Sequence, residues 1–300
     1  MTAGALGDAY TRASWDPLVD VARMLHFGFM RHAFEAATVV AVVAGLVGYF
    51  VVLRSLAFAA HALSHVGFAG ATGAVALGLS PVAGVVVLSA AAAAGIGAMG
   101  ARLRERDVAV GMVMAFSLGL GAFFLALYAG FANEAVAILF GEVLGVSPGD
   151  VAFSWAAGAV VLAGLAALYR PLLFSSLDEE VAEAKGVRVR RVSVAFMVLL
   201  ALAVAEAVQV VGVLLVFALL VAPPAIAQRL ARRPASGLLL SAGLSVAFCW
   251  AGLTLGYWTP YPVSFYITGL AFAAYLAARA GRPALLASRP VSWRPGGPGG

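Results

Sequence analysis

Long apolar stretches separated by short polar segments make up most of this chain. Many of them approach the roughly 20 residues that a helix needs to cross the hydrocarbon core of a bilayer. The pattern predicts an all-α fold, a polytopic transmembrane helix bundle of about nine spans, with eight or ten as alternatives. The spans are expected at residues 34–53, 57–79, 82–101, 108–130, 151–169, 192–207, 209–228, 236–257 and 263–280.

The weakest of these divisions lies between residues 192 and 228, because that stretch is almost continuously apolar. Only Glu206 and Gln209 indicate a turn within it. Two short helices with a tight bend, or one span followed by a broken half-helix, both agree with the pattern.

Composition agrees with a membrane protein: 63% of residues are hydrophobic, 11% are charged, and the mean hydropathy is +1.00. A soluble domain averages about 25% charged residues. The net charge of +5 does not indicate nucleic acid as a partner, because the basic residues are scattered in short loops. We expect a transmembrane domain over 34–280, an outer or interfacial segment over 1–33, and a disordered, Pro/Gly-rich cytoplasmic tail over 281–300.

The distribution of arginine and lysine predicts the orientation, because these residues accumulate in cytoplasmic loops. They occur in alternate loops and are absent from the others, near 79–81, 131–150, 206–210 and 258–262. The N-terminus is therefore expected outside and the C-terminus in the cytoplasm. Arg12, Arg23 and Arg31 oppose this assignment, and an amphipathic helix over 15–32 on the outer surface would account for them.

Two histidines, His61 and His65, lie inside the second expected span. Ionisable side chains at membrane depth are costly and usually face a path through the protein. Four residues apart on a helix, the two imidazoles share one face with Cβ atoms about 5–6 Å apart, and one ion bonded at about 2.0–2.1 Å can bind both rings. The alternative is a pair of polar residues satisfied inside the bundle.

Other polar residues are weaker candidates for a functional role. Glu206 and Gln209 belong either to an interfacial turn or to the metal site, as an extra oxygen ligand or gate. Glu134 and Glu142, in the outer segment, are either solvated or meet the partner that delivers the metal. Glu35 faces either the interface or the outer mouth.

Several motifs are absent. No GxxxxGK[ST] sequence occurs and the only lysine is Lys185, so the chain has no Walker A phosphate loop. The sequence HALSH at 61–65 lacks the glutamate of the HExxH protease motif. We therefore expect no enzymatic activity in this chain.

The segment LFSSLDEEVAEAKGVRVRRVS at 173–193 is polar and is expected in the cytoplasm. Ser176 or Asp178 can cap a short helix there, and Gly186 suits its C-terminal end. An acidic start and a basic end make this helix polarised; the alternative is a solvated loop. The residues concerned are Asp178, Glu179, Glu180, Gly186, Arg188, Arg190 and Arg191.

Five motifs, in order over residues 29–280, are similar to those of one family. The chain resembles the permease subunits of bacterial ABC importers for zinc, manganese and iron ions. The matching segments are the opening span and HALSH helix at 29–71, RERDVAVGMVMAFSLGLG at 104–121, ILFGEVLGVSPGD at 138–150, LDEEVAEAKGV at 177–187 and QVVGVLLVFALLVAPPAIA at 209–227.

The resemblance implies a function and a set of partners. His61 and His65 would line the path of a divalent metal that is transported and not kept as a cofactor. Segment 177–191 would be the coupling helix that docks a cytoplasmic ABC ATPase dimer, through Asp178, Glu179, Glu180, Gly186 and Arg188. An extracytoplasmic metal-binding protein would deliver the ion, and two copies of the chain would pair as a homodimer among the lipids of a bacterial inner membrane.

Two departures from the family pattern bear on the metal. Many relatives have Asp where this chain has His61, and Leu177 replaces the usual Phe before Asp178. Imidazole suits zinc, whereas carboxylate suits manganese, so the sequence favours zinc over manganese or iron. The alternatives are an ATP-independent metal channel or secondary carrier, and an ABC permease for a metal chelate such as a siderophore or cobalamin, against which the small Ala- and Gly-lined helices argue.

Overall fold

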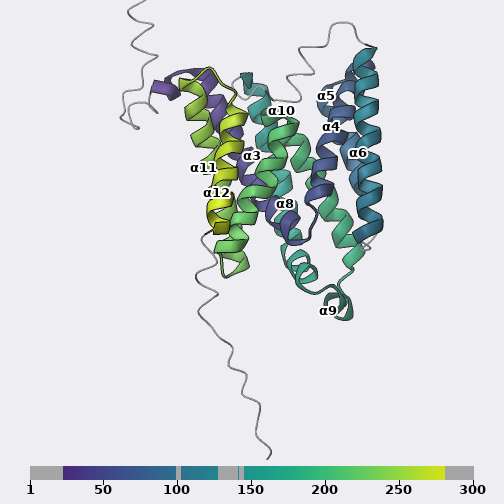
Figure 1. Cartoon of the computed structure of the whole chain (residues 1–300). Coiled ribbons are helices and arrows are strands. Elements are labelled where there is room, and N and C mark those ends of the chain that lie inside the picture. The colour runs from purple at the N-terminus through teal and green to yellow at the C-terminus, as the bar shows by residue number, and fades with distance from the viewer. Residues whose placement is uncertain (1–22, 99–102, 128–140, 142–144, 281–300) are drawn as a thin grey trace, which may run out of the picture.

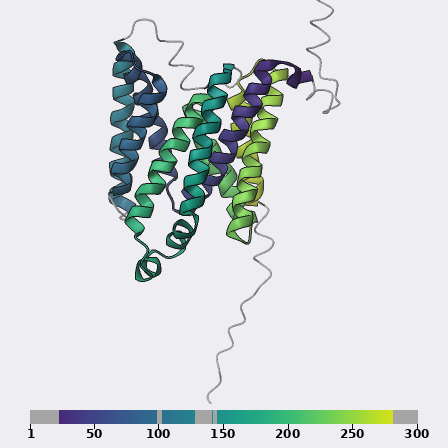
Figure 2. The same ribbon diagram turned by 180° about the vertical axis from the view of Figure 1, so that it is seen from behind.

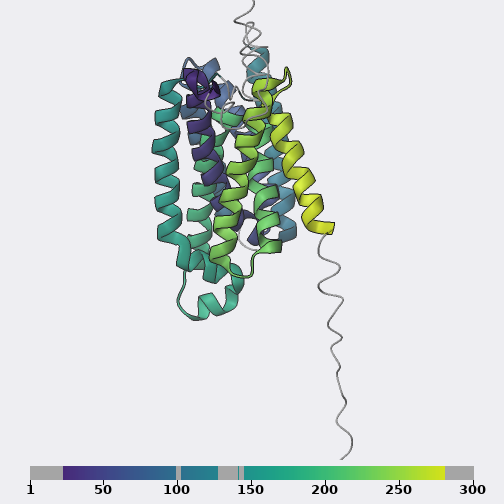
Figure 3. The same ribbon diagram turned by 90° about the vertical axis from the view of Figure 1, so that its left-hand side faces the viewer.

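A computed structural model describes residues 23–98, 103–127, 141 and 145–280 of the protein. The described part is a bundle of helices whose long axes run in broadly the same direction, as Figures 1 and 3 show. The helices are α3 (Gly28–Leu53), α4 (Ala57–Ala76), α5 (Pro81–Ala98), α6 (Leu103–Ala126), α8 (Pro148–Leu177), α9 (Glu179–Ala184), α10 (Val189–Leu230), α11 (Pro234–Trp258) and α12 (Val263–Ala280).

The long helices form two groups with α10 between them. Helices α4, α5 and α6 pack on one another, while α3 packs on α8 and α11. Helix α10 contacts members of both groups, and α3 and α4 touch each other very little. Figures 1 and 2 show the two groups on opposite sides of α10. The short helix α9 projects at one end of the bundle, which is called the α9 end below.

Helix α10 reverses direction at Gly212. This residue has φ 79° and ψ 160°, a conformation that interrupts the helix and that glycine adopts without a steric penalty. Both ends of α10 lie near the end of α3: Ser193 is 2.7 Å from Arg54 Nη2, and Gln228 donates a 2.8 Å bond to the Tyr49 carbonyl. The two halves of α10 are therefore antiparallel, and both ends of the helix lie at the α9 end.

The turn expected at Glu206 and Gln209 is wrong. Both residues are helical, and the break comes at Gly212, within the stretch that had seemed continuous. A polar side chain can be buried in a helix without ending it, whereas the backbone at Gly212 leaves the helical region altogether. Neither of the two arrangements considered is found as stated: a span-length helix, Val189–Val213, is followed after the bend by a shorter apolar helix, Leu215–Leu230.

Six helices in the described ranges are long and apolar enough to cross a membrane. They contain Gly28–Leu53, Asp107–Ala126, Pro148–Leu177, Val189–Val213, Pro234–Trp258 and Val263–Ala280. Two further apolar helices, Pro81–Gly97 and Leu215–Leu230, are shorter, and α4 carries the two polar histidines. The all-helical membrane fold is confirmed, but the count of nine spans is not.

Several boundaries differ from those expected. Helix α3 begins at Gly28, ahead of the expected start at 34, so part of segment 1–33 belongs to the first long helix. Helix α8 continues past 169 to Leu177 and delivers the chain directly to α9. Residues 1–22 and the tail 281–300 lie outside the described residues.

Small residues set the distances between helices. A Cβ atom on Gly84 of α5 would collide with the Gly70 carbonyl of α4, and the reverse holds for Gly70. A Cβ on Gly73 would lie 2.8 Å from the ring of Phe124 in α6. Glycines in α4 thus permit close helix packing, since a side chain at these positions would have no space against the neighbouring helix.

The Gly70–Gly84 contact yields a test of packing. We expect Gly84→Ala to destabilise the protein by about 1–3 kcal/mol, because the added methyl has no space against the Gly70 carbonyl. Gly95→Ala, in the same helix, is the matched control: nothing lies within 4 Å of its Cβ position, and alanine favours a helix by about 1 kcal/mol over glycine. Thermal unfolding in detergent would measure both, and equal midpoints for the two variants would contradict the packing assignment.

Candidate functional site

His61 and His65 form a pair on α4, as their spacing predicts. Their Nε2 atoms are 3.3 Å apart, and the rings meet edge to face with centroids separated by 4.6 Å. Both side chains are half-buried. The helix is regular through this turn, and the intervening Ser64 donates a 3.2 Å bond to the Ala60 carbonyl, so no backbone distortion is needed to bring the rings together.

The pair has a geometry that suits a shared metal ion. An ion bonded to both Nε2 atoms at about 2.1 Å would have an N–metal–N angle of about 104°, which is near tetrahedral. Within the described residues no third His, Cys, Asp or Glu joins the two rings in a metal-binding group. Two protein ligands leave coordination positions for water or for another chain, as an ion in transit requires.

The second nitrogen of each ring is not hydrogen-bonded. In the part of the chain that the structure describes, Nδ1 of His61 and Nδ1 of His65 are both buried without a partner. Histidines in permanent metal centres almost always donate this N–H to a second group, which fixes the ring. The pair therefore lacks the support that a structural metal site has.

The histidines lie along a partly exposed stripe on the surface of the chain. Phe58, one turn before His61 on the same face, is 40% exposed. The Phe217 ring, from the second half of α10, lies 4.8 Å from the His61 ring between centroids and is also half-buried. Sequence reasoning missed Phe217, because the reversal at Gly212 is what brings it beside α4.

Glu206 is deeply buried but lies elsewhere. Its side chain is 1% exposed, and neither carboxylate oxygen has a hydrogen-bond partner among the described residues. A Cβ built on Gly158 of α8 would be 3.3 Å from Glu206 Oε1 and would also meet Val39 of α3. The preceding Ala205 instead packs against α4 and α5. The carboxylate thus faces α3 and α8, on a different side of α10 from the histidine-bearing helix.

The remaining polar candidates that the structure describes do not join the pair. Gln209 makes a long 3.4 Å contact with the Ala205 carbonyl of its own helix. Glu35 lies near the start of α3 and is exposed. Glu134 and Glu142 lie outside the described residues.

The polar segment after α8 contains the short helix that the sequence predicts. Asp178 is its N-cap, and Asp178 Oδ1 accepts a 2.9 Å bond from the Val181 amide. At the other end Gly186 has φ 84°, and its amide and that of Val187 bond back to Glu183 and Ala182. This is the hydrogen-bond pattern with which many helices end at a glycine.

The surface of α9 is polar and accessible. All five residues proposed for ATPase coupling are exposed: Asp178, Glu179, Glu180, Gly186 and Arg188. Ala182, on the opposite side of α9, is fully buried and holds the helix against the bundle. Arg188 is the N-cap of α10, so the polar surface continues to the start of the next long helix.

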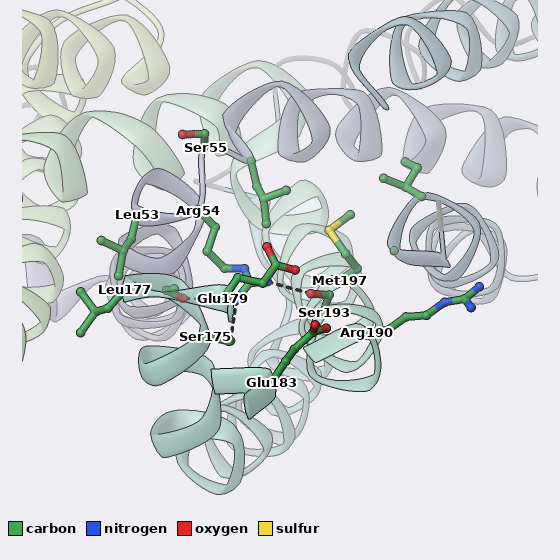
Figure 4. Close-up of a pocket in the computed structure, with 14 residues that line it drawn as sticks. Leu53, Arg54, Ser55, Ser175, Leu177, Glu179, Glu183, Arg190, Ser193 and Met197 are labelled. Carbon is green, nitrogen blue, oxygen red and sulfur yellow. Dashed lines mark hydrogen bonds between the residues drawn. The ribbon is translucent and has the colours of Figure 1, made fainter. Parts of the chain in front are cut away.

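A cavity of about 470 Å³ lies beside α9 (Figure 4). It is bounded by the turn between α3 and α4, the end of α5, the end of α8 and the start of α10. Glu179 and Glu183 of α9 line the cavity, and so does Arg54. An arginine directly after an apolar span commonly indicates a cytoplasmic helix end, so the sequence did not predict that Arg54 lines a cavity.

Comparisons with known proteins identify the family. Residues 26–281 match the ABC 3 transport family. The chain is 33% identical over 233 residues to the manganese transport system membrane protein MntC of Halalkalibacterium halodurans, covering 77% of this chain and 80% of that protein. It is 33% identical over 232 residues to the manganese import system permease protein ScaB of Streptococcus parasanguinis, covering 77% and 82%.

A solved structure gives the same result. The structure of PsaBC from Streptococcus pneumoniae in complex with Fab superimposes with a TM-score of 0.78 and 30% identity, covering 87% of this chain and 94% of the solved one. The chain therefore belongs to the ABC 3 transport family and is a membrane permease of a metal-ion ABC transporter. The expectation of a transporter subunit and not an enzyme is confirmed by these relatives.

The 3.3 Å histidine pair predicts a particular mutational pattern. If one ion needs both rings, His61→Ala, His65→Ala and the double variant should weaken zinc binding to the purified protein about equally, by roughly tenfold, the loss expected for about 1.4 kcal/mol. His32→Ala, on α3, is the control and should leave binding unchanged. Calorimetric titration with zinc chloride measures the affinities, and losses that add in the double variant would show that the rings bind separately.

Proposed function

We propose that this chain is the permease of an ATP-driven importer that moves a divalent transition metal ion into the cytoplasm, and that His61 and His65 contact the ion on its path. The observation that carries the proposal is a half-exposed histidine pair on α4, in the helix bundle of a metal-transporter permease. An intramembrane imidazole is costly and is retained where it serves a substrate.

Manganese is the cargo that the relatives favour. Two relatives at 33% identity are named as manganese transport proteins. The preference for zinc drawn from His61 has no support from them. Imidazole binds several divalent metals, and selectivity also depends on coordination geometry and metal availability, so two histidines alone do not select the cargo. We therefore propose manganese, with zinc competing for the same two nitrogens.

A second copy of the chain would complete the path. The stripe that contains Phe58, His61 and Phe217 is left partly exposed by the protomer. Polar rings facing lipid would be unfavourable, and a twofold partner covering the same stripe would enclose them. In such a homodimer four imidazoles would surround a central path, and the ion would pass between the copies.

The energy would come from a separate ATPase dimer bound at the α9 end. The sequence contains no phosphate-binding loop of its own, and α9 offers an exposed, acidic-to-basic surface. An extracytoplasmic metal-binding protein would dock at the opposite end. The α9 end would then be cytoplasmic, with the N-terminus outside and the C-terminus inside, as the arginine distribution predicts. The proposed ion path rests on the two histidines and does not include Glu206 or Gln209.

Uptake into proteoliposomes tests the proposed function. The permease reconstituted with its ATPase and binding protein should accumulate manganese only with ATP, and excess zinc should inhibit. His61→Ala and His65→Ala should each lower uptake by at least about tenfold, since each removes one of two ligands. His32→Ala should transport normally.

Three outcomes would overturn this proposal in whole or in part. Uptake by the permease alone, indifferent to ATP, would identify a channel or secondary carrier. Transport of a siderophore or cobalamin chelate, with no transport of the bare ion, would identify a chelate importer. Normal uptake by both histidine variants would remove the pair from the ion path.

The capped helix α9 gives a separate test of docking. Asp178→Ala removes the bond to the Val181 amide, a loss of about 1 kcal/mol for an N-cap, and should weaken ATPase binding about fivefold because the docking surface is then less ordered. Asp150→Ala is the matched control, since Asp150 belongs to the capping box of α8 at the other end of the bundle. Affinity would be measured by titrating labelled ATPase, and equal losses in both variants would exclude α9 as the docking surface.

A further inference from the structure

Arg54 links three separate segments at the α9 end. Its Nη1 atom donates to the hydroxyl oxygens of Ser175 at 3.0 Å and Ser176 at 3.2 Å, and its Nη2 atom donates to that of Ser193 at 2.7 Å. Ser175 and Ser176 lie in the last turn of α8, and Ser193 lies near the start of α10. The guanidinium thus joins the turn after α3 to the segments on both sides of α9 (Figure 4).

The serines on α8 are arranged as acceptors. Both Ser175 and Ser176 donate their own hydroxyl protons to the Leu172 carbonyl. Their oxygen lone pairs are thereby directed at the arginine. A guanidinium is a planar fork with fixed donor directions, so it holds several acceptors in one relative geometry, which a lysine cannot do.

The turn that carries Arg54 leads directly to the histidine helix. Arg54 is the C-cap of α3, Ser55 adopts φ 55°, and Leu56 immediately precedes α4. The Leu56 amide bonds to the Val51 carbonyl at 2.8 Å, so the turn is tightly bonded to the helix before it. His61 lies seven residues after Arg54 and about one helical turn into α4.

Little else connects α3 to α4, which packs on α5, α6 and α10. Residues 178–188 connect α8 to α10 and contain α9, and Arg54 joins the two ends of this segment through its three serines. A displacement of α9 that changed the separation between the α8 serines and Ser193 would also act on the guanidinium and on the start of α4, which follows it.

We propose that Arg54 is the positioning residue that transmits movement of the docked α9 to the metal-contacting helix α4, through its hydrogen bonds to Ser175, Ser176 and Ser193. The proposal rests on the proposed function, since it presumes an ATPase at α9 and a metal at the histidines. It adds a coupling residue that is neither a metal contact nor part of the exposed docking surface.

The test measures metal uptake and ATP hydrolysis on the same reconstituted complex of permease, ATPase and binding protein. Arg54→Lys keeps the positive charge but removes the planar guanidinium that can donate to all three serines at once. We expect hydrolysis near the wild-type rate and manganese transported per ATP lowered by roughly 5-fold or more, the lower limit of typical coupling between sites. Arg229→Lys is the matched control, since this arginine packs over the Tyr275 ring away from the serines, and its ratio should not change.

Ser193→Ala provides a second variant in case Arg54→Lys does not assemble. It removes the 2.7 Å contact alone and should lower the transport-to-hydrolysis ratio in the wild type but cause no further loss in Arg54→Lys. Unchanged ratios, or parallel losses of hydrolysis and uptake, would overturn the coupling role. If the wild-type complex and both variants transport the same amount of metal per ATP, this inference is refuted and the proposed function stands. If the wild-type complex shows no ATP-driven uptake, the proposed function and this inference are both refuted.

Discussion

Inside a bilayer every polar group has to find its partner within the protein, and the architecture of this permease follows from that requirement. The backbone is satisfied by helices, and several hydroxyls of the described helices bond the preceding turn of their own helix, as Thr72 does to the Phe68 carbonyl and Thr268 to the Ser264 carbonyl. Against this background the unsatisfied groups stand out. The Nδ1 atoms of the histidine pair and the carboxylate of Glu206 are among the exceptions in the described residues.

The same requirement explains why the bundle is divided as it is. Helices with few polar groups associate by close contact, and contacts such as Gly70 with Gly84 bring α4 and α5 together as one unit. Helix α10 fills the space between the two groups by running along the bundle and back. Because α3 and α4 are joined by a short turn and little direct packing, the two groups are held together chiefly through α10, whose buried side chains join both groups in one hydrophobic core.

Local features of this protein were predictable from its sequence, and long-range ones were not. The histidine pair and the caps of α9 depend on residues within four positions of one another, so the helical period determines them. The turn in α10 was predicted at Glu206 and Gln209 because they are the polar residues of an apolar stretch. The chain instead reverses at Gly212, a glycine among valines, because glycine can adopt the backbone conformation that the turn requires. The cluster at Arg54 joins residues 121, 122 and 139 positions apart, and no sequence spacing reveals such a contact. The identity of the metal was not predictable either, because two imidazoles accept several ions.

The unsupported rings of His61 and His65 have a kinetic consequence. A metal centre whose ligands are held by second hydrogen bonds exchanges its ion slowly, because the ligands cannot turn aside. If His61 and His65 bind the ion as proposed, neither imidazole would be fixed by a hydrogen bond at Nδ1, so each ring could turn away from the ion in its own step. Such an arrangement would favour a short dwell time of the ion over tight capture.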